Sequence, residues 1–405
     1  MKCVLFITHF KPCKSGYASY AYYLINSIAK QKSDLPLVVL GCNENIDKKF
    51  AIENMRNVII TRCWGSKMFI SDVFKIIYNV FKYKPSKIYV YYPLFTAFGN
   101  YLLNMFANVI LLLMLTLSAP SLRAKLLIDL DNVPKPEAPP KSKIYFLTLL
   151  SPLSIPYFLR DKIVIVCRNL IMEKILAKYL RNLRTRFIPH GCPTPKPTLP
   201  EESLRLKNIL GFGDKKVVLY LGYISRYKGI DYLIKAFAKI HKKFPQAMLL
   251  VAGDYFNPLD KYRPKKHTYL PTLKKLVRDL ALEERVIFHT FHIPDECLKF
   301  YLAIADIICF PYITSNISFS GILALAMSYG KPVIVSNCGW FNDVIIDGEN
   351  GLVVPEKNID ALAEAIALLL GNDMLRLKLG SSLASRADEF SWDNITLLWL
   401  KLLVN

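Results

Sequence analysis

The sequence predicts an α/β fold of two domains, and three observations carry that prediction. The chain has 405 residues, of which 53% are hydrophobic, so it can form two sizeable cores. Short apolar runs typical of buried strands alternate with helical patterns along the chain. Residues 193–203, PTPKPTLPEES, contain four prolines that interrupt the apolar pattern. We therefore expect a linker there, with one domain on either side of it.

The N-terminal segment predicts a strand, a turn and a helix. Residues 1–10, MKCVLFITHF, form a short apolar run without the longer apolar core and small-residue cleavage site of a signal peptide. Export by that route is therefore not expected. Pro12 and Gly16 predict the turn. An apolar stripe at helical spacing follows, namely Ala18, Ala21, Leu24 and Ile25.

Residues 98–117, FGNYLLNMFANVILLLMLTL, are long and apolar enough to raise the question of a membrane span. Asn100, Asn104 and Asn108 fall four residues apart, on one helical face, which argues against a span. We expect an amphipathic helix that ends near Asn108, followed by a buried strand, in a soluble fold. Contact of this region with a membrane interface stays open as the alternative.

Two further strands are expected before the linker. Residues 126–132, LLIDLDN, predict a strand that ends in the polar residues Asp129, Asp131 and Asn132. Residues 162–169, KIVIVCRN, predict another strand, and a basic helix follows it near residues 172–183. The polar residues at the end of the first strand either line a site or cap the strand in a turn, and both alternatives stay open.

The most informative stretch is residues 315–352. Ser320 precedes Gly321 and an apolar run at helical spacing, so Ser320 is the expected N-cap of a short helix that ends at Gly330. Residues 333–335 then predict a strand buried on both faces. The free N–H groups and partial positive charge of a helix start suit a diphosphate. Because ligands of open α/β sheets bind at the carboxyl ends of strands, we expect a phosphate and sugar pocket here.

Four blocks in the C-terminal half carry a family resemblance. They are residues 218–237, residues 248–254, residues 286–312, and the run AMSYGKPVIVSNCG followed by DGENGLVVP within residues 326–355. Together they resemble the donor-binding signature of GT-B glycosyltransferases, and particularly that of glycosyltransferase family 4. The resemblance implies an α/β fold with the GT-B architecture, in which two Rossmann-like, doubly wound domains face each other across a cleft and the C-terminal helix returns to the first domain.

The resemblance also implies roles for the domains. Residues 1–192 would form an N-terminal, acceptor-side domain, and residues 204–385 a C-terminal nucleotide-sugar domain. Residues 386–405 contain an amphipathic helix with Ser391 as its expected N-cap, which would pack back on the first domain. The implied activity is transfer of a sugar from a nucleotide-diphosphate donor, UDP- or GDP-linked, to a glycan or lipid-linked acceptor. This donor is a co-substrate, and no other cofactor is expected.

The catalytic candidates that the resemblance implies are Asp131, Lys228 and Arg226. In the turn GYISRYKG, Lys228 matches the family's lysine, whereas Tyr223 stands at the family's arginine position, so Arg226 would reach in from a neighbouring place. Two cations and a helix start make a diphosphate clamp. Asp131 takes the place of a family histidine and could accept hydrogen bonds from sugar hydroxyls. For Arg226, an exposed turn residue is the alternative.

The remaining candidates are donor-binding residues in five segments. They are Gly16 and Tyr17 in the first turn, His190 in the motif IPHG, Thr290, Phe291 and Ile293 in the loop at 288–295, Ser318, Phe319, Ser320, Gly321 and Ile322 at the helix start, and Asp343 after the buried strand. The resemblance implies that the loop at 288–295 holds the base, with an apolar side chain against the face of the base. For Gly16 and Tyr17, a plain turn between strand and helix is the alternative. For His190, a structural role near the interdomain cleft is the alternative.

One departure from the family pattern bears on activity. The family's two glutamates, eight positions apart, correspond to Ile317 and Leu325 here, and neither side chain can accept a hydrogen bond from a sugar. Two explanations stay open: an active branch in which Ser318, Ser320 and backbone N–H groups hold the donor, or a non-catalytic GT-B-like binding or scaffold protein. For the active branch, the resemblance implies retention of the anomeric configuration. The cations and the helix start reduce the need for a metal, and none is expected.

The formal net charge of +21 attracts phosphates of some kind. No nucleic-acid-binding signature accompanies this charge, so nucleic acid is not an expected partner, and the anionic surface of a membrane is the better candidate. Nine cysteines are scattered without a C-x-x-C pair, which indicates a reducing compartment and gives no metal site. We expect a cytoplasmic protein, either free or peripheral on the inner face of the membrane.

Overall fold

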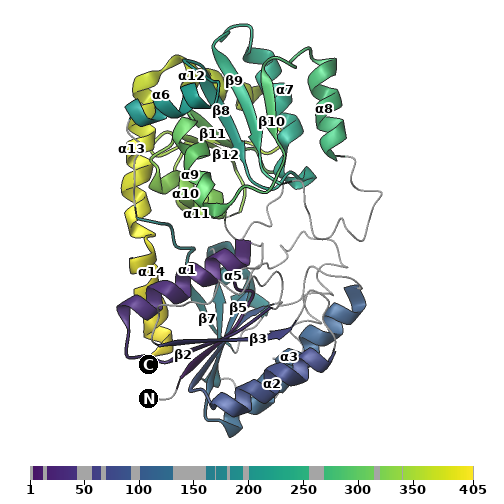
Figure 1. The fold of residues 1–405 in the computed structure, drawn as a ribbon, viewed down its shortest axis with the longest axis vertical. Coiled ribbons are helices and arrows are strands. Elements are labelled where there is room, and N and C mark those ends of the chain that lie inside the picture. The colour runs from purple at the N-terminus through teal and green to yellow at the C-terminus, as the bar shows by residue number, and fades with distance from the viewer. Residues whose placement is uncertain are drawn as a thin grey trace. The chain divides into compact units, whose positions relative to one another are not determined.

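The computed structural model divides the chain into two compact units. Unit 1 comprises Met1–Gly191 and Trp392–Asn405, and unit 2 comprises Cys192–Ser391. The residues that the structure describes are 3–11, 16–42, 57–64, 70–92, 101–130, 161–168, 170–179, 183–194, 200–254, 269–313, 320–339 and 341–404. Each unit is built on a parallel β-sheet with helices on both faces (Figure 1), as predicted.

The sheet of unit 1 has the strand order β3-β2-β1-β4-β5-β6-β7, and all neighbouring strands that the structure describes are parallel. The strands are β1 (Val4–Ile7), β2 (Leu37–Cys42), β3 (Val58–Trp64), β4 (Lys87–Tyr92), β5 (Lys125–Leu130), β6 (Ile163–Cys167) and β7 (Arg184–Phe187). The inner strands β1, β2 and β4 are buried along their whole length, as expected for a parallel sheet with both faces covered.

Two hydrophobic cores lie on the two faces of this sheet. Helices α2 (Ile70–Tyr83), α3 (Tyr101–Ser121) and α5 (Leu170–Tyr179) pack on one face, and α1 (Gly16–Gln31) and α14 (Trp392–Leu403) on the other. In β4, Ile88 and Val90 contribute to the first core, while Tyr89 and Tyr91 contribute to the second, because successive strand residues point to opposite faces. The C-terminal helix therefore returns to the first domain, as predicted.

Helix α3 corrects the prediction for residues 98–117. We expected a helix to Asn108 and then a strand, but α3 runs without a break from Tyr101 to Ser121. Its second half is rich in leucine and methionine, which favour helix, and the hydroxyls of Thr116 and Ser118 donate to the carbonyl oxygens of Leu112 and Met114 one turn earlier. Within the described part of the chain, no helix combines the length and apolar character that a membrane crossing requires.

The sheet of unit 2 has the order β10-β9-β8-β11-β12-β13, again with parallel neighbours in the described residues. The strands are β8 (Lys216–Leu221), β9 (Ala247–Ala252), β10 (Val286–His289), β11 (Ile307–Phe310), β12 (Val333–Ser336) and β13 (Leu352–Val354). The chain proceeds outward from β8 to β9 and β10, and then returns to the other side of β8 as β11. The strand order therefore reverses between β8 and β11.

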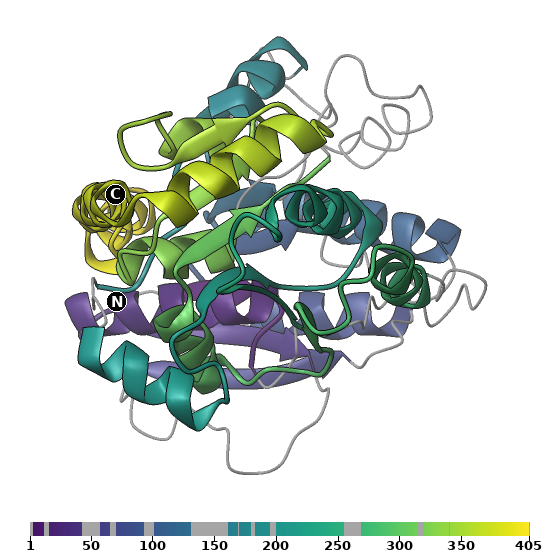
Figure 2. The ribbon, with the colours of Figure 1, turned by 90° about the horizontal axis from the view of Figure 1, so that it is seen from above.

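Helices lie on both sides of this sheet in Figures 1 and 2. They are α6 (Pro200–Ile209), α7 (Ile230–Ile240), α8 (Tyr269–Asp279), α9 (Asp295–Ile304), α10 (Gly321–Ser328), α11 (Phe341–Val344), α12 (Ile359–Gly371) and α13 (Asp373–Glu389). Helix α7 lies beside α8 and α12, α9 beside α6, and α10 beside α13. Helix α6 begins inside the segment predicted as linker, because Pro200 is tolerated in a first helical turn and Glu201 and Glu202 favour that end.

One cysteine departs from the pattern of free thiols that is expected for a reducing compartment. Seven of those in the described residues are free thiols, but Cys42 at the end of β2 is in a disulfide. Spacing along the sequence did not show this, because the pairing of cysteines depends on their approach in space.

Candidate functional site

The candidate site lies at the carboxyl ends of β8, β11 and β12 in unit 2. These three strands are neighbours in the sheet, so the loops that follow them leave the same edge. The order of strands reverses between β8 and β11, and in open α/β sheets this switch point is where ligands bind. The turn after β8 carries Lys228, and the segment after β11 leads to Ser320 at the start of α10.

The turn after β8 is packed directly against the segment after β11. It ends in a short 3₁₀ helix, Arg226–Lys228, and then in Gly229, whose φ of 67° places it in the left-handed region. A Cβ at Gly229 would lie 1.9 Å from the carbonyl oxygen of Pro311. The N–H of Ile313 donates to the carbonyl oxygen of Tyr227 at 2.9 Å. The two loops therefore form one rigid corner, and only glycine fits at its closest approach.

Lys228 occupies an aromatic, partly desolvated position in this corner. Its Nζ lies 3.8 Å from the centroid of the Tyr312 ring and 4.9 Å from that of Tyr227. Burial lowers the pKa of Lys228 to about 7, and the nearby Cys338 opposes this shift only in part. An ammonium held over an aromatic face gains a cation–π interaction. Even so, an anion beside Lys228 would stabilise its charged form further.

Helix α10 presents its first turn beside the same tyrosine. Ser320 is the N-cap, as predicted, and its Oγ accepts a hydrogen bond from the N–H of Leu323 at 3.3 Å. A hydrogen bond also joins Ser320 to the side chain of Tyr312. Space is open around Gly321, where a Cβ would have no heavy atom within 4 Å. The start of α10 can therefore accept an anion on its outer side.

Arg226 points elsewhere in this structure. It is exposed, and its guanidinium lies 5.2 Å from the ring centroid of Tyr269 in α8. The hydroxyl of Tyr269 in turn donates to Asp231 at 2.7 Å. In a 3₁₀ helix residues two apart project in different directions, which separates Arg226 from Lys228. Lys228 and Ser320 therefore both contact Tyr312, whereas the side chain of Arg226 points toward Tyr269 in α8.

The predicted base-binding loop follows β10, the strand at the edge of the sheet. Phe291 is 53% exposed there and stacks on His289, with ring centroids 5.9 Å apart. Thr290 is half-buried, whereas Ile293 is buried in the core of unit 2. Of the two apolar candidates, only Phe291 has a side chain exposed enough to meet a base. His289 was not among the predicted residues. Its Nδ1 lies 3.1 Å from the Tyr301 hydroxyl, and this contact orients the imidazole ring on which Phe291 stacks.

Asp343 and Leu325 lie on the two helices that follow β12 and β11, respectively. Asp343 is in α11, after β12, and its backbone carbonyl accepts from Arg386 at 3.3 Å. Leu325, at a family glutamate position, lies on α10 and packs against the hydrophobic core. The side chain of Ile322 reaches toward the turn after β8 and would lie 4.0 Å from a Cβ on Gly222. Of these two positions, only Asp343 has a carboxylate like the ones in the family pattern.

The candidates in unit 1 form no site that the described residues reveal. Gly16 is the first residue of α1, and the Tyr17 ring lies 4.8 Å from that of Tyr91. His190 is buried against the rings of Tyr20 and Trp392, and its Nδ1 lies 2.5 Å from the carbonyl oxygen of Gly191. Burial and the charge of Arg168 lower the pKa of His190 to about 3. This neutral, enclosed imidazole favours the structural role.

Three predicted residues, Asp131, Ser318 and Phe319, lie outside the described residues. Just before Asp131, the structure shows a feature that sequence reasoning missed. Asp129 is fully buried at the end of β5, where it pairs with the equally buried Arg168 and accepts from the hydroxyl of Tyr89. The Arg168 guanidinium stacks over the Tyr20 ring at 3.8 Å. This ion pair joins β5, β6 and α1 beneath the carboxyl edge of the sheet.

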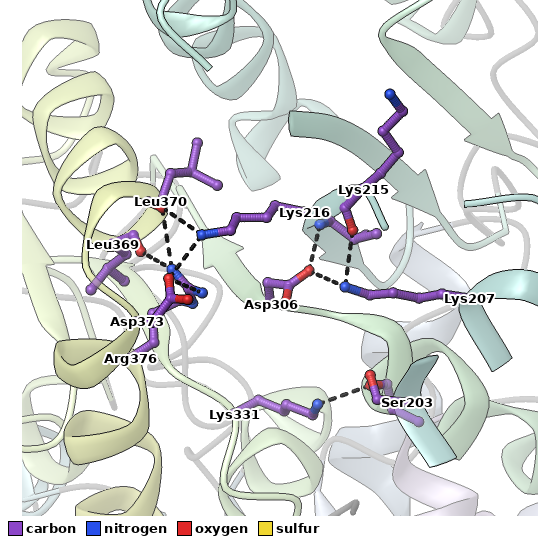
Figure 3. Close-up of polar contacts among 12 residues, drawn as sticks. Ser203, Lys207, Lys215, Lys216, Asp306, Lys331, Leu369, Leu370, Asp373 and Arg376 are labelled. Atoms are coloured by element: carbon purple, nitrogen blue, oxygen red, sulfur yellow. Dashed lines mark hydrogen bonds and ion pairs between the residues drawn. The ribbon is translucent and has the colours of Figure 1, made fainter. Parts of the chain in front are cut away.

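A second polar network supports unit 2 at the opposite ends of its strands (Figure 3). Asp306 accepts from Lys207 Nζ at 2.6 Å and from the N–H of Val217 at 2.7 Å, which joins α6, β8 and the start of β11. Ser203 Oγ and Lys331 Nζ both donate to the carbonyl oxygen of Ala303, at 2.7 and 2.9 Å. These cations have structural partners, and they account for part of the large positive charge. Among the described residues, no group of three or more metal-ligating side chains could hold a metal ion.

Comparison with known proteins bears on both the fold and the family. The fold of the two Rossmann-like units is that of GT-B proteins. The structure of HepE from Anabaena with UDP and glucose covers 100% of both chains with a TM-score of 0.74 at 18% identity. Sucrose-phosphate synthase from Thermosynechococcus elongatus matches with a TM-score of 0.73 at 20% identity, over 99% of this chain and 98% of that one.

The family resemblance is confirmed for the C-terminal half. Residues 204–386 match the family model described as Glycosyl transferases group 1. A GDP-mannose-dependent alpha-(1-6)-phosphatidylinositol monomannoside mannosyltransferase of Mycolicibacterium smegmatis is 30% identical over 178 residues, 43% of each chain. A D-inositol 3-phosphate glycosyltransferase of Corynebacterium glutamicum is 31% identical over 179 residues, 44% of this chain and 40% of that protein. The match thus spans less than half the length of these relatives.

Proposed function

We propose that the protein is a glycosyltransferase that moves a sugar from a nucleotide-diphosphate donor to a glycan or lipid-linked acceptor. The observation that carries the proposal is the convergence of Lys228 and the N-cap Ser320 on Tyr312 at the switch point of unit 2. One cation and one helix start at a switch point are suited to a diphosphate. The family match over residues 204–386 supports this assignment of the donor site.

The proposed chemistry uses electrostatic stabilisation of the leaving group. When the bond between the sugar C1 and the diphosphate oxygen breaks, negative charge grows on the diphosphate. Lys228 and the N–H groups at the start of α10 would stabilise that charge where it develops. The acceptor oxygen forms the new bond to C1 and loses its proton to the departing diphosphate. Retention of configuration is a part of the proposal that rests on the family resemblance. Independence from metal is a part that rests on Lys228 and the helix start, which reduce the need for a metal.

The donor base and the acceptor are proposed as classes. HepE is described in complex with UDP, and the Mycolicibacterium smegmatis relative is named as GDP-mannose-dependent, so both UDP and GDP donors are to be tested. That relative is also named for a phosphatidylinositol mannoside, which supports a lipid-linked acceptor as one class. With the formal net charge of +21, this supports a place on the cytoplasmic side of an anionic membrane.

A second candidate function is a binding or scaffold protein with the same fold. The observation in its favour is Leu325, whose apolar side chain packs on the core where the family pattern has a glutamate. Nucleotide binding without transfer to any of a broad mixture of acceptors would support this candidate. Measurable turnover would exclude it.

The test is a titration of the purified protein with UDP, GDP and their sugar conjugates, in wild type and in Lys228→Ala. We expect one nucleotide to bind, and we expect Lys228→Ala to weaken it by about tenfold or more, which is about 1.4 kcal/mol. Arg226→Ala is the matched control, because the structure directs Arg226 toward Tyr269. If no nucleotide binds, or if Lys228→Ala leaves binding unchanged, the proposed donor site is wrong.

A further inference from the structure

The outer face of helix α2 in unit 1 is aromatic. Phe74, Tyr78 and Phe81 are 56%, 68% and 44% exposed. They are spaced at positions i, i+4 and i+7, so they form one stripe along the helix. A large aromatic side chain left in water forgoes the free energy of burial, and three in one stripe form a patch rather than scattered exposure.

This stripe is not required to build unit 1. A different face of α2 supplies Val73, Ile76, Ile77 and Val80 to the core, and all four are buried. The helix is therefore anchored to the sheet by one apolar face and carries a second one outward. A helix with apolar residues on both faces is typical of an element that has a second apolar environment.

Helix α3 carries a further exposed apolar side chain. It lies beside α2 in unit 1 (Figure 1). Leu117 is 54% exposed, and Val109, Ile110 and Met114 along the same helix are partly buried. The whole of α3, YLLNMFANVILLLMLTLSAPS, has no charged residue. Of the α3 side chains that the structure describes, Leu117 therefore adds to the exposed apolar side chains of α2.

The exposed charges at the C-terminal ends of these two helices are positive. Lys82 and Lys84 are exposed at the end of α2, and Arg123 and Lys125 are exposed after the end of α3. In the described residues 70–84 and 101–125, the one carboxylate is Asp72, which is buried and paired with Lys75 at 2.8 Å. Exposed apolar side chains with cations at one end, and no exposed carboxylate in these described residues, complement a surface that is apolar within and anionic at its border.

We propose that the α2–α3 surface, defined by Phe74, Tyr78, Phe81 and Leu117 with Lys82 and Lys84, docks on an anionic phospholipid bilayer. Aromatic rings favour the boundary between headgroups and acyl chains, and lysines extend their ammonium groups to lipid phosphates. The electrostatic attraction between anionic lipid and each basic residue near the membrane surface strengthens binding. This inference does not rest on the proposed sugar transfer, because it uses no residue of unit 2.

The first test places a fluorescent reporter in the stripe. Phe74→Trp is compared with Met374→Trp, at an exposed position on α13 of unit 2, in the presence of vesicles of phosphatidylglycerol and phosphatidylcholine. The emission of wild type is subtracted from that of each variant. We expect the added emission of Phe74→Trp to shift to the blue and to be quenched by brominated acyl chains, and that of Met374→Trp to do neither. Equal behaviour of the two variants would overturn the proposed surface.

The second test measures cosedimentation with these vesicles and with vesicles of phosphatidylcholine alone. The triple variant Phe74→Ala, Tyr78→Ala, Phe81→Ala should bind anionic vesicles at least about tenfold more weakly than wild type, which is about 1.4 kcal/mol. The matched control replaces Leu368, Met374 and Leu377, which are exposed in unit 2, with alanine. Lys82→Glu with Lys84→Glu should weaken binding more than Lys242→Glu with Lys243→Glu.

Three outcomes would overturn the proposal. Wild type could fail to bind anionic vesicles, or the stripe variant could bind as well as its control. Alternatively, wild type could be a dimer in solution that the stripe variant converts to a monomer, in which case a second copy covers the stripe. Because the nucleotide titration is done without lipid, its result and the vesicle result remain distinguishable.

Discussion

Lys228 is the residue on which the donor site depends most. In the free protein its pKa is lowered to about 7 by burial, so at pH 8 only about a tenth of the molecules carry the charge. A bound diphosphate favours the charged form and raises this pKa. Binding at pH 8 should therefore take up close to one proton, while binding at pH 6 should take up almost none. Affinity should fall about tenfold from pH 6 to pH 8.

The measurement is calorimetry of a nucleotide sugar in buffers of different ionisation enthalpy. The sugar conjugate is used because its diphosphate has no group that titrates in this range. Lys228→Arg is the control, since arginine keeps its charge at both pH values and should abolish the proton uptake. Proton release at pH 8, or equal uptake in Lys228→Arg, would contradict the assigned role.

Asp306 is the residue whose loss should damage unit 2 most without touching the site. It accepts from Lys207 and from the N–H of Val217, and the Lys207 side chain is only 10% exposed (Figure 3). Asp306→Ala leaves that cation without its carboxylate, so we expect a loss of about 3 kcal/mol of unfolding free energy. Asp360→Ala, which breaks the exposed pair with Lys239, should cost less than about 0.5 kcal/mol. Urea unfolding of both variants checks the difference.

Local pattern and long-range packing explain which residues could be predicted. The cap at Ser320 was predictable, because a serine before an apolar helical pattern is a local signal. Tyr312, Asp306 and the pair of Asp129 with Arg168 were missed, because their roles depend on partners far away in the sequence. Arg226 was predicted from its charge, but the direction of its side chain depends on the 3₁₀ turn.

At the scale of elements, the corner between the β8 turn and the β11 segment depends on Gly229. A methyl group there would meet the Pro311 carbonyl oxygen and would also occupy the left-handed region. We expect Gly229→Ala to destabilise unit 2 by about 3 kcal/mol and to weaken nucleotide binding by about tenfold. Gly348→Ala is matched in φ, at 73°, but has open space around it, so it should cost about 1 kcal/mol and leave binding unchanged. Equal effects would show that the close approach is unimportant.

The start of α10 can be tested by the loss of its cap. Ser320→Ala removes the oxygen that accepts from the Leu323 N–H and should cost about 1 kcal/mol of stability. Asn358→Ala removes an equivalent cap from α12, where Asn358 accepts from the Ala361 N–H at 3.0 Å. Both variants should lose a similar amount of stability, but only Ser320→Ala should also weaken nucleotide binding, by about tenfold. Equal nucleotide affinity in the two variants would remove α10 from the site.

Among the elements, the alternation of strands and helices was predictable, but α3 was not. In the sequence, Asn100, Asn104 and Asn108 indicated an early end, whereas packing on the sheet and the leucine-rich second half continue the helix to Ser121. The aromatic stripe of α2 was also missed. Phe74, Tyr78 and Phe81 recur at the spacing of a helix core, and only the position of the sheet shows that the other face is the buried one.

At the scale of the whole molecule, each unit has hydrophobic cores of its own. The cores of unit 1 include α14 from the far end of the chain, while the core of unit 2 is built from Cys192 to Ala387. Resemblance to a family predicted this return of the C-terminal helix, which no local pattern could have shown. The division into units implies that stability and ligand binding can be changed separately in each.

Substitution of Trp399 and binding of a nucleotide should therefore affect different unfolding transitions. Trp399 is fully buried in unit 1, with its ring 5.4 Å from that of Tyr89, so Trp399→Ala should destabilise unit 1 by about 3–5 kcal/mol. A nucleotide at about a hundred times its Kd should stabilise unit 2 alone by about 2.7 kcal/mol. In calorimetry we expect two transitions, one lowered by the substitution and the other raised by the nucleotide. A single transition that shifts with both the substitution and the nucleotide would mean that the units unfold together. The free energy of interaction between the units would then exceed the difference between their own unfolding free energies.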